Sequence, residues 1–107
     1  ARADIALYVG GMGPRGANFY TEVVSRLGWA GAAARIQDLF LDGHRHAAAA
    51  AVPDDLLEAL TLIGAPAAVA ARLRALREAG VDTLVVRGLG DRPAEQLAVL
   101  RALMDAA

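Results

Sequence analysis

A glycine motif near the start of the chain is the first candidate for chemistry. Gly11, Gly13 and Gly16 have the spacing Gly-x-Gly-x-x-Gly, which lets the backbone approach a pyrophosphate in dinucleotide-binding proteins. The N-terminus of the helix that follows would also favour an anion. However, Pro14 removes one N–H from this loop, and no strand ending in an acid follows about twenty residues later, where that motif needs one. We therefore interpret the glycines as positions of close packing and turning.

A second candidate lies at residues 87–90, with the sequence Arg-Gly-Leu-Gly. It directly follows the apolar run 84–86, whose β-branched residues favour a strand covered on both faces. Ligands bind at the carboxyl ends of strands in α/β sheets and barrels, and a guanidinium beside two glycines suits an anion. Arg87 and Gly88 are therefore site candidates, and an ordinary strand-to-helix loop is the alternative.

The remaining polar residues show no catalytic or metal-binding pattern. His44 and His46 are two positions apart, which puts them on different faces of a helix, and no third ligand stands near them in the sequence. Ser25 is the only serine and falls within a predicted helix, so a Ser–His–acid set is not expected. The chain contains no cysteine, which excludes disulfides and thiolate metal ligands.

Composition narrows the function classes further. The chain has 107 residues and a net charge of −1, so no basic field indicates nucleic acid or an anionic membrane as a partner. No apolar run is long enough to span a membrane, and no signal segment is seen, so the expected location is cytoplasmic. Alanine supplies much of the 56% hydrophobic content, and alanine buries little area per residue. The core should therefore be thin unless another surface completes it.

The elements that position the candidate residues are predicted to be mostly helices. Residues 64–88 form a helix-turn-strand unit, in which Pro66 suits the first helical turn and Gly80 suits the left-handed position after the last. The strand of this unit is expected at 83–87. The apolar stripe of its helix consists of Val69, Leu73 and Leu76.

Further helices are predicted on both sides of this unit. A helix over 17–27 should stop at Gly28, and its expected inner face consists of Tyr20, Val23, Val24 and Leu27. The other predicted helices cover 31–41 and 44–51, a short stretch from Asp54, and a last stretch from Pro93 with Leu97, Leu100, Leu103 and Met104 facing inward. The apolar run 5–9 fits a strand or a helix, because periodicity cannot separate the two in so short a run.

The strand at 83–87 has too few possible partners in this chain. A parallel strand needs neighbours that come from other βα units, and only the run 5–9 offers a second strand. The fold class expected for these residues is therefore mostly α with one or two short strands. We expect residues 1–107 to be a single segment of a larger α/β protein, which the absence of a starting methionine also suits.

Several short motifs occur in order along most of the chain. They are ALYVGGMG at 6–13, NFY at 18–20, IQDLFLDG at 36–43, AAAVPDDL at 49–56 and EAGVDTL at 78–84. In their order and spacing they resemble the bacterial luciferase-like monooxygenases, and in particular the branch of coenzyme F-420-dependent oxidoreductases. The resemblance covers residues 5 to 88.

The resemblance implies a fold and an activity. The family fold is a TIM-type (β/α)8 barrel of roughly three times this length, and the chain would be its C-terminal part, with the last barrel strand at 83–87. Residues 5–12 would then be helical, with Gly10 and Gly11 as points of close packing. The whole enzyme would transfer hydride or oxygen to or from a small-molecule substrate, using coenzyme F-420 (a deazaflavin) or FMN.

The resemblance also indicates which residues would line the pocket. Most residues that hold the coenzyme ring would lie on earlier strands, so no catalytic residue is assigned, and the segment alone should be inactive and bind neither coenzyme. The pocket candidates are Gly11, Met12, Arg15, Asn18, Phe19, Arg87 and Gly88. The alternative is a small helical interaction or dimerisation module without catalysis. In either case exposed apolar surface at 83–87 predicts a homo-oligomer, with a two-fold dimer expected.

Overall fold

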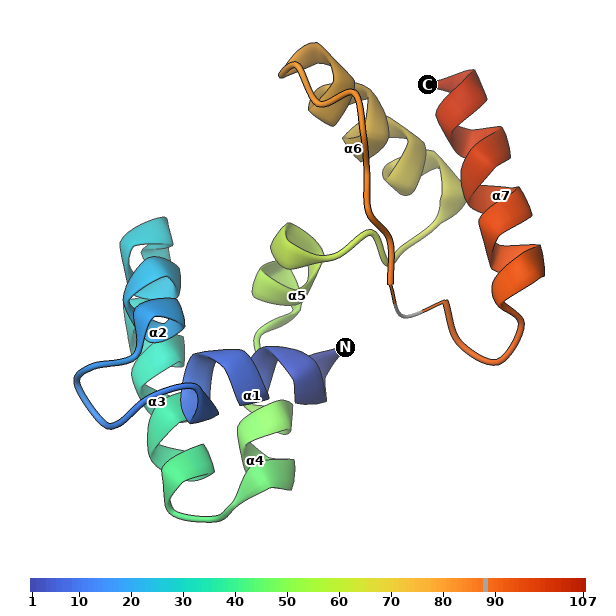
Figure 1. Ribbon diagram of the computed structural model, residues 1–107. Coiled ribbons are helices and arrows are strands. Elements are labelled where there is room, and N and C mark those ends of the chain that lie inside the picture. The colour runs from blue at the N-terminus through green and yellow to red at the C-terminus, as the bar shows by residue number, and fades with distance from the viewer. Residues whose placement is uncertain (88) are drawn as a thin grey trace. The chain divides into compact units, whose positions relative to one another are not determined.

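The computed structural model describes residues 1–87 and 89–107, and these residues are mostly helical. They divide into two compact units, Ala1–Thr61 and Leu62–Ala107 (Figure 1). The predicted mostly helical class is confirmed, but none of the described residues forms a strand. None of the described helices is long and apolar enough to cross a membrane.

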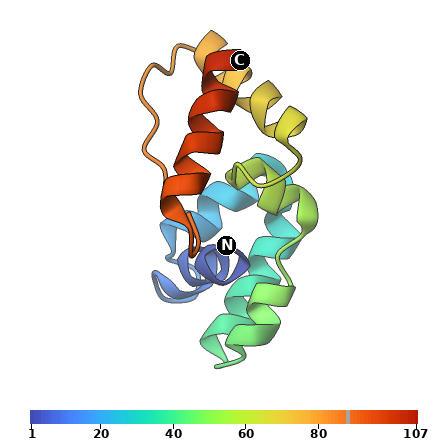
Figure 2. The ribbon, with the colours of Figure 1, turned by 90° about the vertical axis from the view of Figure 1, so that its right-hand side faces the viewer.

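The first unit is a helical cluster built around α3. Its helices are α1 (Arg2–Gly11), α2 (Phe19–Val24), the π-helical turn η1 (Ser25–Trp29), α3 (Ala30–Leu41), α4 (Arg45–Ala50) and α5 (Asp54–Leu60). Helix α1 packs against α3 and α4, and α2 packs against both α1 and α3 (Figure 1, Figure 2). The predicted helices over 31–41 and 44–51 and from Asp54 are thus confirmed.

The core of this unit is closed by small and branched apolar side chains. Its largest fully buried members are Val9, Ile36, Val52 and Leu56, which come from α1, α3, the α4–α5 turn and α5. Trp29 is half-buried against the same cluster. Burying such side chains stabilises a fold by roughly 1.5–3 kcal/mol each, so the unit has a core of its own.

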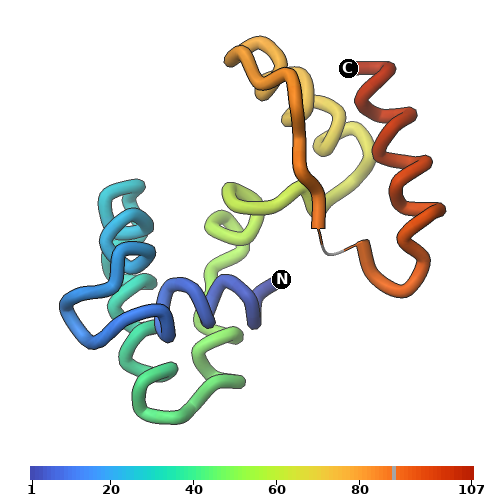
Figure 3. Tube along the Cα trace, viewed as in Figure 1, coloured from blue at the N-terminus to red at the C-terminus, as the bar shows by residue number. Residues whose placement is uncertain are grey.

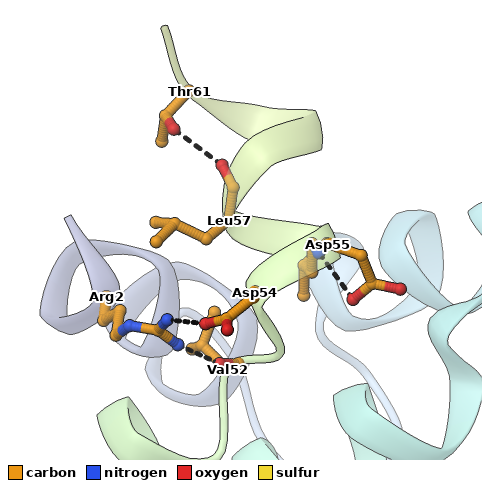
Figure 4. A network of polar contacts seen from close by, with 7 residues as sticks. Arg2, Val52, Asp54, Asp55, Leu57 and Thr61 are labelled. Carbon is orange, nitrogen blue, oxygen red and sulfur yellow. Dashed lines mark hydrogen bonds and ion pairs between the residues drawn. The ribbon is translucent and has the colours of Figure 1, made fainter. Parts of the chain in front are cut away.

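A polar network ties the start of α1 to the start of α5 (Figure 4). The Arg2 guanidinium donates to the carbonyl of Val52 and forms an ion pair with Asp54. Asp55 accepts a hydrogen bond from the N–H of Leu56 at 2.8 Å, in the first turn of α5, where carboxylates also favour the positive end of the helix dipole. The two Arg2 contacts hold the start of α5 beside α1.

The two glycines at the end of α1 are required by close packing. A Cβ added at Gly10 would lie 2.5 Å from the Phe40 Cβ, and one added at Gly11 would lie 2.4 Å from the Phe40 Cε1. Helices α1 and α3 therefore approach each other where α1 has no side chains. This confirms the packing role and the predicted helix, which ends at Gly11 and not at Met12, and the alternative of a strand at 5–9 is wrong.

The helix that begins at Phe19 stops at Gly28, so that prediction is confirmed. Gly28 has φ +111° and ψ 2°, which is not helical, and the chain kinks there before α3 begins. A glycine takes this left-handed conformation at little steric cost, which is why it is favoured just past a helix end. The predicted inner face is only partly buried, because Val24 is buried whereas Tyr20 and Leu27 are exposed.

The second unit contains α6 (Pro66–Glu78) and α7 (Pro93–Ala106), which pack against each other. Gly80 follows α6 with φ +95°. Its N–H donates to the Arg77 carbonyl and the N–H of Val81 donates to the Leu76 carbonyl, both at 3.0 Å. This pair of hydrogen bonds is the Schellman motif, so the helix end predicted at Gly80 is confirmed.

The strand predicted at 83–87 is absent from the structure. Residues 81–87 have no regular secondary structure, and Gly88, the last residue of the predicted helix-turn-strand unit, lies outside the described residues. A strand is defined by hydrogen bonds to a neighbour, and no other described segment supplies one. Helix α7 likewise has no buried residue, so its predicted inner face is at most half-buried in these 107 residues.

Candidate functional site

Five of the seven predicted pocket residues lie where α1 passes into α2. Gly11 ends α1, Phe19 begins α2, and Met12, Arg15 and Asn18 lie in the loop between them. The structure therefore brings these five together. Arg87 is exposed and belongs to the second unit, and Gly88 lies outside the described residues.

Asn18 fixes the geometry of this loop. It is 4% exposed, and its Oδ1 accepts hydrogen bonds from the N–H groups of Tyr20 at 2.9 Å and Thr21 at 3.3 Å. Its Nδ2 donates to the carbonyls of Tyr8 at 3.1 Å and Val9 at 3.0 Å. An amide side chain has two donor hydrogens and two acceptor lone pairs, so Asn18 uses its full capacity to join α1 to α2.

Two glycines of the loop, Gly13 and Gly16, allow backbone arrangements that a side chain would disturb. The N–H of Ala17 donates to the Pro14 carbonyl at 3.0 Å, and Gly16 has φ +79° at the third position of this turn, where glycine is favoured. A Cβ at Gly13 would lie 2.7 Å from the Ala17 carbonyl oxygen. The spacing Gly-x-Gly-x-x-Gly is therefore explained by helix packing and a turn, as the sequence indicated.

Arg15 is held by two carboxylates at the C-terminal end of α3, one in its last turns and one directly after it. It forms ion pairs with Asp38 and with Asp42, the latter at 3.3 Å. One cation and two anions give this cluster a net charge of −1, which disfavours a bound phosphate or carboxylate. Arg15 therefore fastens the loop to α3 and does not provide an anion site.

The exposed surface of the site is apolar and aromatic. Phe19 is 70% exposed and Met12 is 50% exposed. The ring of Tyr20 makes edge-to-face contacts with Phe19 and with Tyr8, with centroid separations of 5.4 and 5.0 Å. Edge-to-face geometry is favoured by the charge distribution of aromatic rings. Tyr8 and Tyr20 were not predicted as site residues, although their aromatic character beside Phe19 was a visible signal.

A hollow of about 390 Å³ lies in the second unit, between α6, α7 and residues 80–84. Its lining is mostly apolar, and Arg77, Asp82 and Thr83 supply its polar side chains. The Arg77 guanidinium donates to the carbonyls of Met104 at 2.8 Å and Ala107 at 2.7 Å. Arg77 thus secures the last turn of α7, where a cation is favoured by the helix dipole.

These arrangements limit the chemistry of the described residues. They contain no cluster of histidines, carboxylates or cysteines that could hold a metal ion. The side chains of Arg15 and Asn18 in the α1–α2 loop are occupied by contacts within the protein, whereas those of Met12 and Phe19 are exposed. The cluster of Arg15 with its two carboxylates therefore does not fit the phosphate of a flavin or deazaflavin coenzyme.

Comparison with known proteins gives the family. The model of the luciferase-like monooxygenases matches residues 1–83. The chain belongs to this family. The luciferase-like fold is a TIM-type barrel, which agrees with the resemblance seen in the sequence.

A curated relative supports the assignment. It is the Mycobacterium tuberculosis (strain ATCC 25618 / H37Rv) protein named "Putative coenzyme F420-dependent oxidoreductase Rv3520c", which is 33% identical over 100 residues. The match covers 94% of this chain and 28% of the relative, so the chain spans little more than a quarter of that protein's length. No solved structure matches the chain.

Proposed function

We propose that these residues are the C-terminal part of an oxidoreductase that uses coenzyme F-420 or FMN to transfer hydride or oxygen to or from a small-molecule substrate. The match to the luciferase-like family over residues 1–83 carries this proposal. The name of the mycobacterial relative supports F-420 in particular. The reaction would be a property of the whole protein.

The second unit supplies the end of the barrel in this proposal. Helix α6, the Schellman turn and the apolar segment 83–87 follow one another in the order helix, turn, strand, and α7 is then the final helix. Half-buried Leu84 and Val86 alternate with exposed Val85, as side chains do along a strand. With neighbouring strands in place, this segment would become the last strand, and Arg87 and Gly88 would lie at its carboxyl end.

The α1–α2 loop would contribute shape and apolar contact to the pocket. Met12 and Phe19 are the exposed members of the predicted set in this loop, and Asn18 and Gly11 hold the backbone that carries them. Because Arg15 is paired with two carboxylates, the phosphate of the coenzyme would be bound by residues elsewhere in the barrel. The flavin or deazaflavin supplies the redox chemistry when it is bound.

The test is a titration of the whole protein, expressed from the complete gene, with coenzyme F-420 and with FMN. We expect one of the two to bind with a change in its absorption or fluorescence spectrum. A substrate screen should then find compounds that oxidise or reduce the bound coenzyme. If the whole protein binds neither coenzyme, the proposal is refuted and the non-catalytic interaction module takes its place.

A further inference from the structure

The α1–α2 loop is fixed by buried contacts at its two ends. Residues 12–17 connect α1 to α2 (Figure 3). Before the loop, the glycines that end α1 pack against Phe40, and after it buried Asn18 joins α1 to α2. Among the described residues, 12–17 make their hydrogen bonds to α3 and its C-cap only through Arg15. The position of the middle of the loop therefore depends on this one side chain.

Two carboxylates hold the two arms of the Arg15 guanidinium. The Arg15 Nη1 pairs with Asp38, and the Arg15 Nη2 lies 3.3 Å from the Asp42 Oδ1. Positions four apart lie on one face of a helix, so the two carboxylates stand beside each other. The planar fork of arginine can engage both at once, which fixes its direction as well as its place. All three side chains belong to the first unit, so their arrangement requires no other part of the protein.

The two carboxylates are unfavourable for α3 itself. Asp38 lies in the last turn of α3, and Asp42 is its C-cap. The C-terminal end of a helix carries a partial negative charge, so carboxylates are disfavoured there. Aspartate also has a lower helix propensity than alanine, leucine or glutamine. Since the carboxylates do not stabilise the helix that carries them, their contact with Arg15 indicates that they serve the loop.

We propose that Asp38 and Asp42 are positioning residues of the coenzyme or substrate pocket, which act through Arg15 on the α1–α2 loop. Arg15 is the second residue of the turn in which the N–H of Ala17 donates to the Pro14 carbonyl, so holding Arg15 holds the turn. This turn lies between the exposed side chains of Met12 and Phe19 and sets the shape of the surface between them. The inference rests on the function proposed above, because that function places the loop in the pocket.

The experiment uses the whole protein, expressed from the complete gene, with three loop variants and one control. The loop variants are Arg15→Gln, Asp38→Asn and Asp42→Asn. They should raise the KM for the substrate found in the screen about two- to five-fold, as the loss of an exposed ion pair predicts, with kcat unchanged. The matched control is Arg26→Gln, which breaks the exposed pair of Arg26 with Glu22 and should change neither constant.

Hydrogen exchange gives a second readout that does not depend on activity. The Ala17 amide, which donates to the Pro14 carbonyl, should exchange about two- to five-fold faster in the loop variants. The Thr21 amide, which Asn18 holds, should exchange as in the wild type. Unchanged exchange at Ala17 would overturn the proposal, and so would faster exchange without a rise in KM.

The two readouts also separate this proposal from the function on which it rests. A whole protein that binds neither coenzyme would refute the proposed function and the pocket with it. The exchange of the Ala17 amide would then still decide whether the two carboxylates position the loop.

Discussion

Replacing Asn18 tests the joint between α1 and α2 most sharply. Asn18→Ala removes the N-cap of α2, which costs about 1 kcal/mol. It also removes the donors to the carbonyls of Tyr8 and Val9, of which the Val9 carbonyl keeps the Thr21 hydroxyl as a donor, and this loss costs about 1–3 kcal/mol. We therefore expect the free energy of unfolding of the first unit to fall by about 2–4 kcal/mol.

Asn18→Asp separates the two halves of this effect. Aspartate keeps an oxygen for the N–H groups of Tyr20 and Thr21 and is as good an N-cap as asparagine. When ionised it has no hydrogen to donate, and it sets a carboxylate oxygen against carbonyl oxygens. We therefore expect it to destabilise the unit as Asn18→Ala does, in spite of the intact cap.

The assay is urea unfolding followed by tryptophan fluorescence. Trp29 is the only tryptophan of the chain and packs against the core of the first unit, so its signal reports that unit. If Asn18→Ala lowers the free energy of unfolding by less than about 0.5 kcal/mol, the hydrogen bonds of this side chain do not stabilise the contact between α1 and α2. Wild-type stability of Asn18→Asp would show that the two donated hydrogen bonds do not matter.

Three further predictions use the same assay or a direct binding measurement. Gly10→Ala should destabilise the first unit by about 1–3 kcal/mol because its Cβ would lie 2.5 Å from Phe40, whereas Gly31→Ala, with nothing within 4 Å, should be neutral or stabilising. Leu56→Ala, at a fully buried position, should cost about 2–5 kcal/mol in urea unfolding, whereas Leu60→Ala, at an exposed position of the same helix, should change the stability little. The isolated chain should bind neither coenzyme, because a barrel-mouth site is assembled from the loops of many strands. Equal effects within either variant pair would contradict the packing described here.

The helices could be predicted from the sequence because their ends carry local signals. Pro66 and Pro93 begin helices α6 and α7 as expected, and Gly80 ends α6 in the left-handed conformation. The secondary structure of the first helix, α1, could not be predicted from such local signals. Its apolar run fits a strand equally well, and only the family resemblance favoured a helix.

The errors came from features that depend on the rest of the fold. The strand at 83–87 needs a partner that the described residues do not contain. Arg15 pairs with two carboxylates that lie more than twenty residues away in the sequence. No local sequence pattern predicts such a pairing.

The measurement that tests the central claim most directly is calorimetric titration of coenzyme F-420 and FMN into two samples, the whole protein and the 107-residue chain. The account predicts that the whole protein binds one of these coenzymes and that the chain alone binds neither. Micromolar binding by the chain alone would contradict it, because the coenzyme site would then lie within these residues and the glycine motif would have to be reconsidered as a phosphate loop.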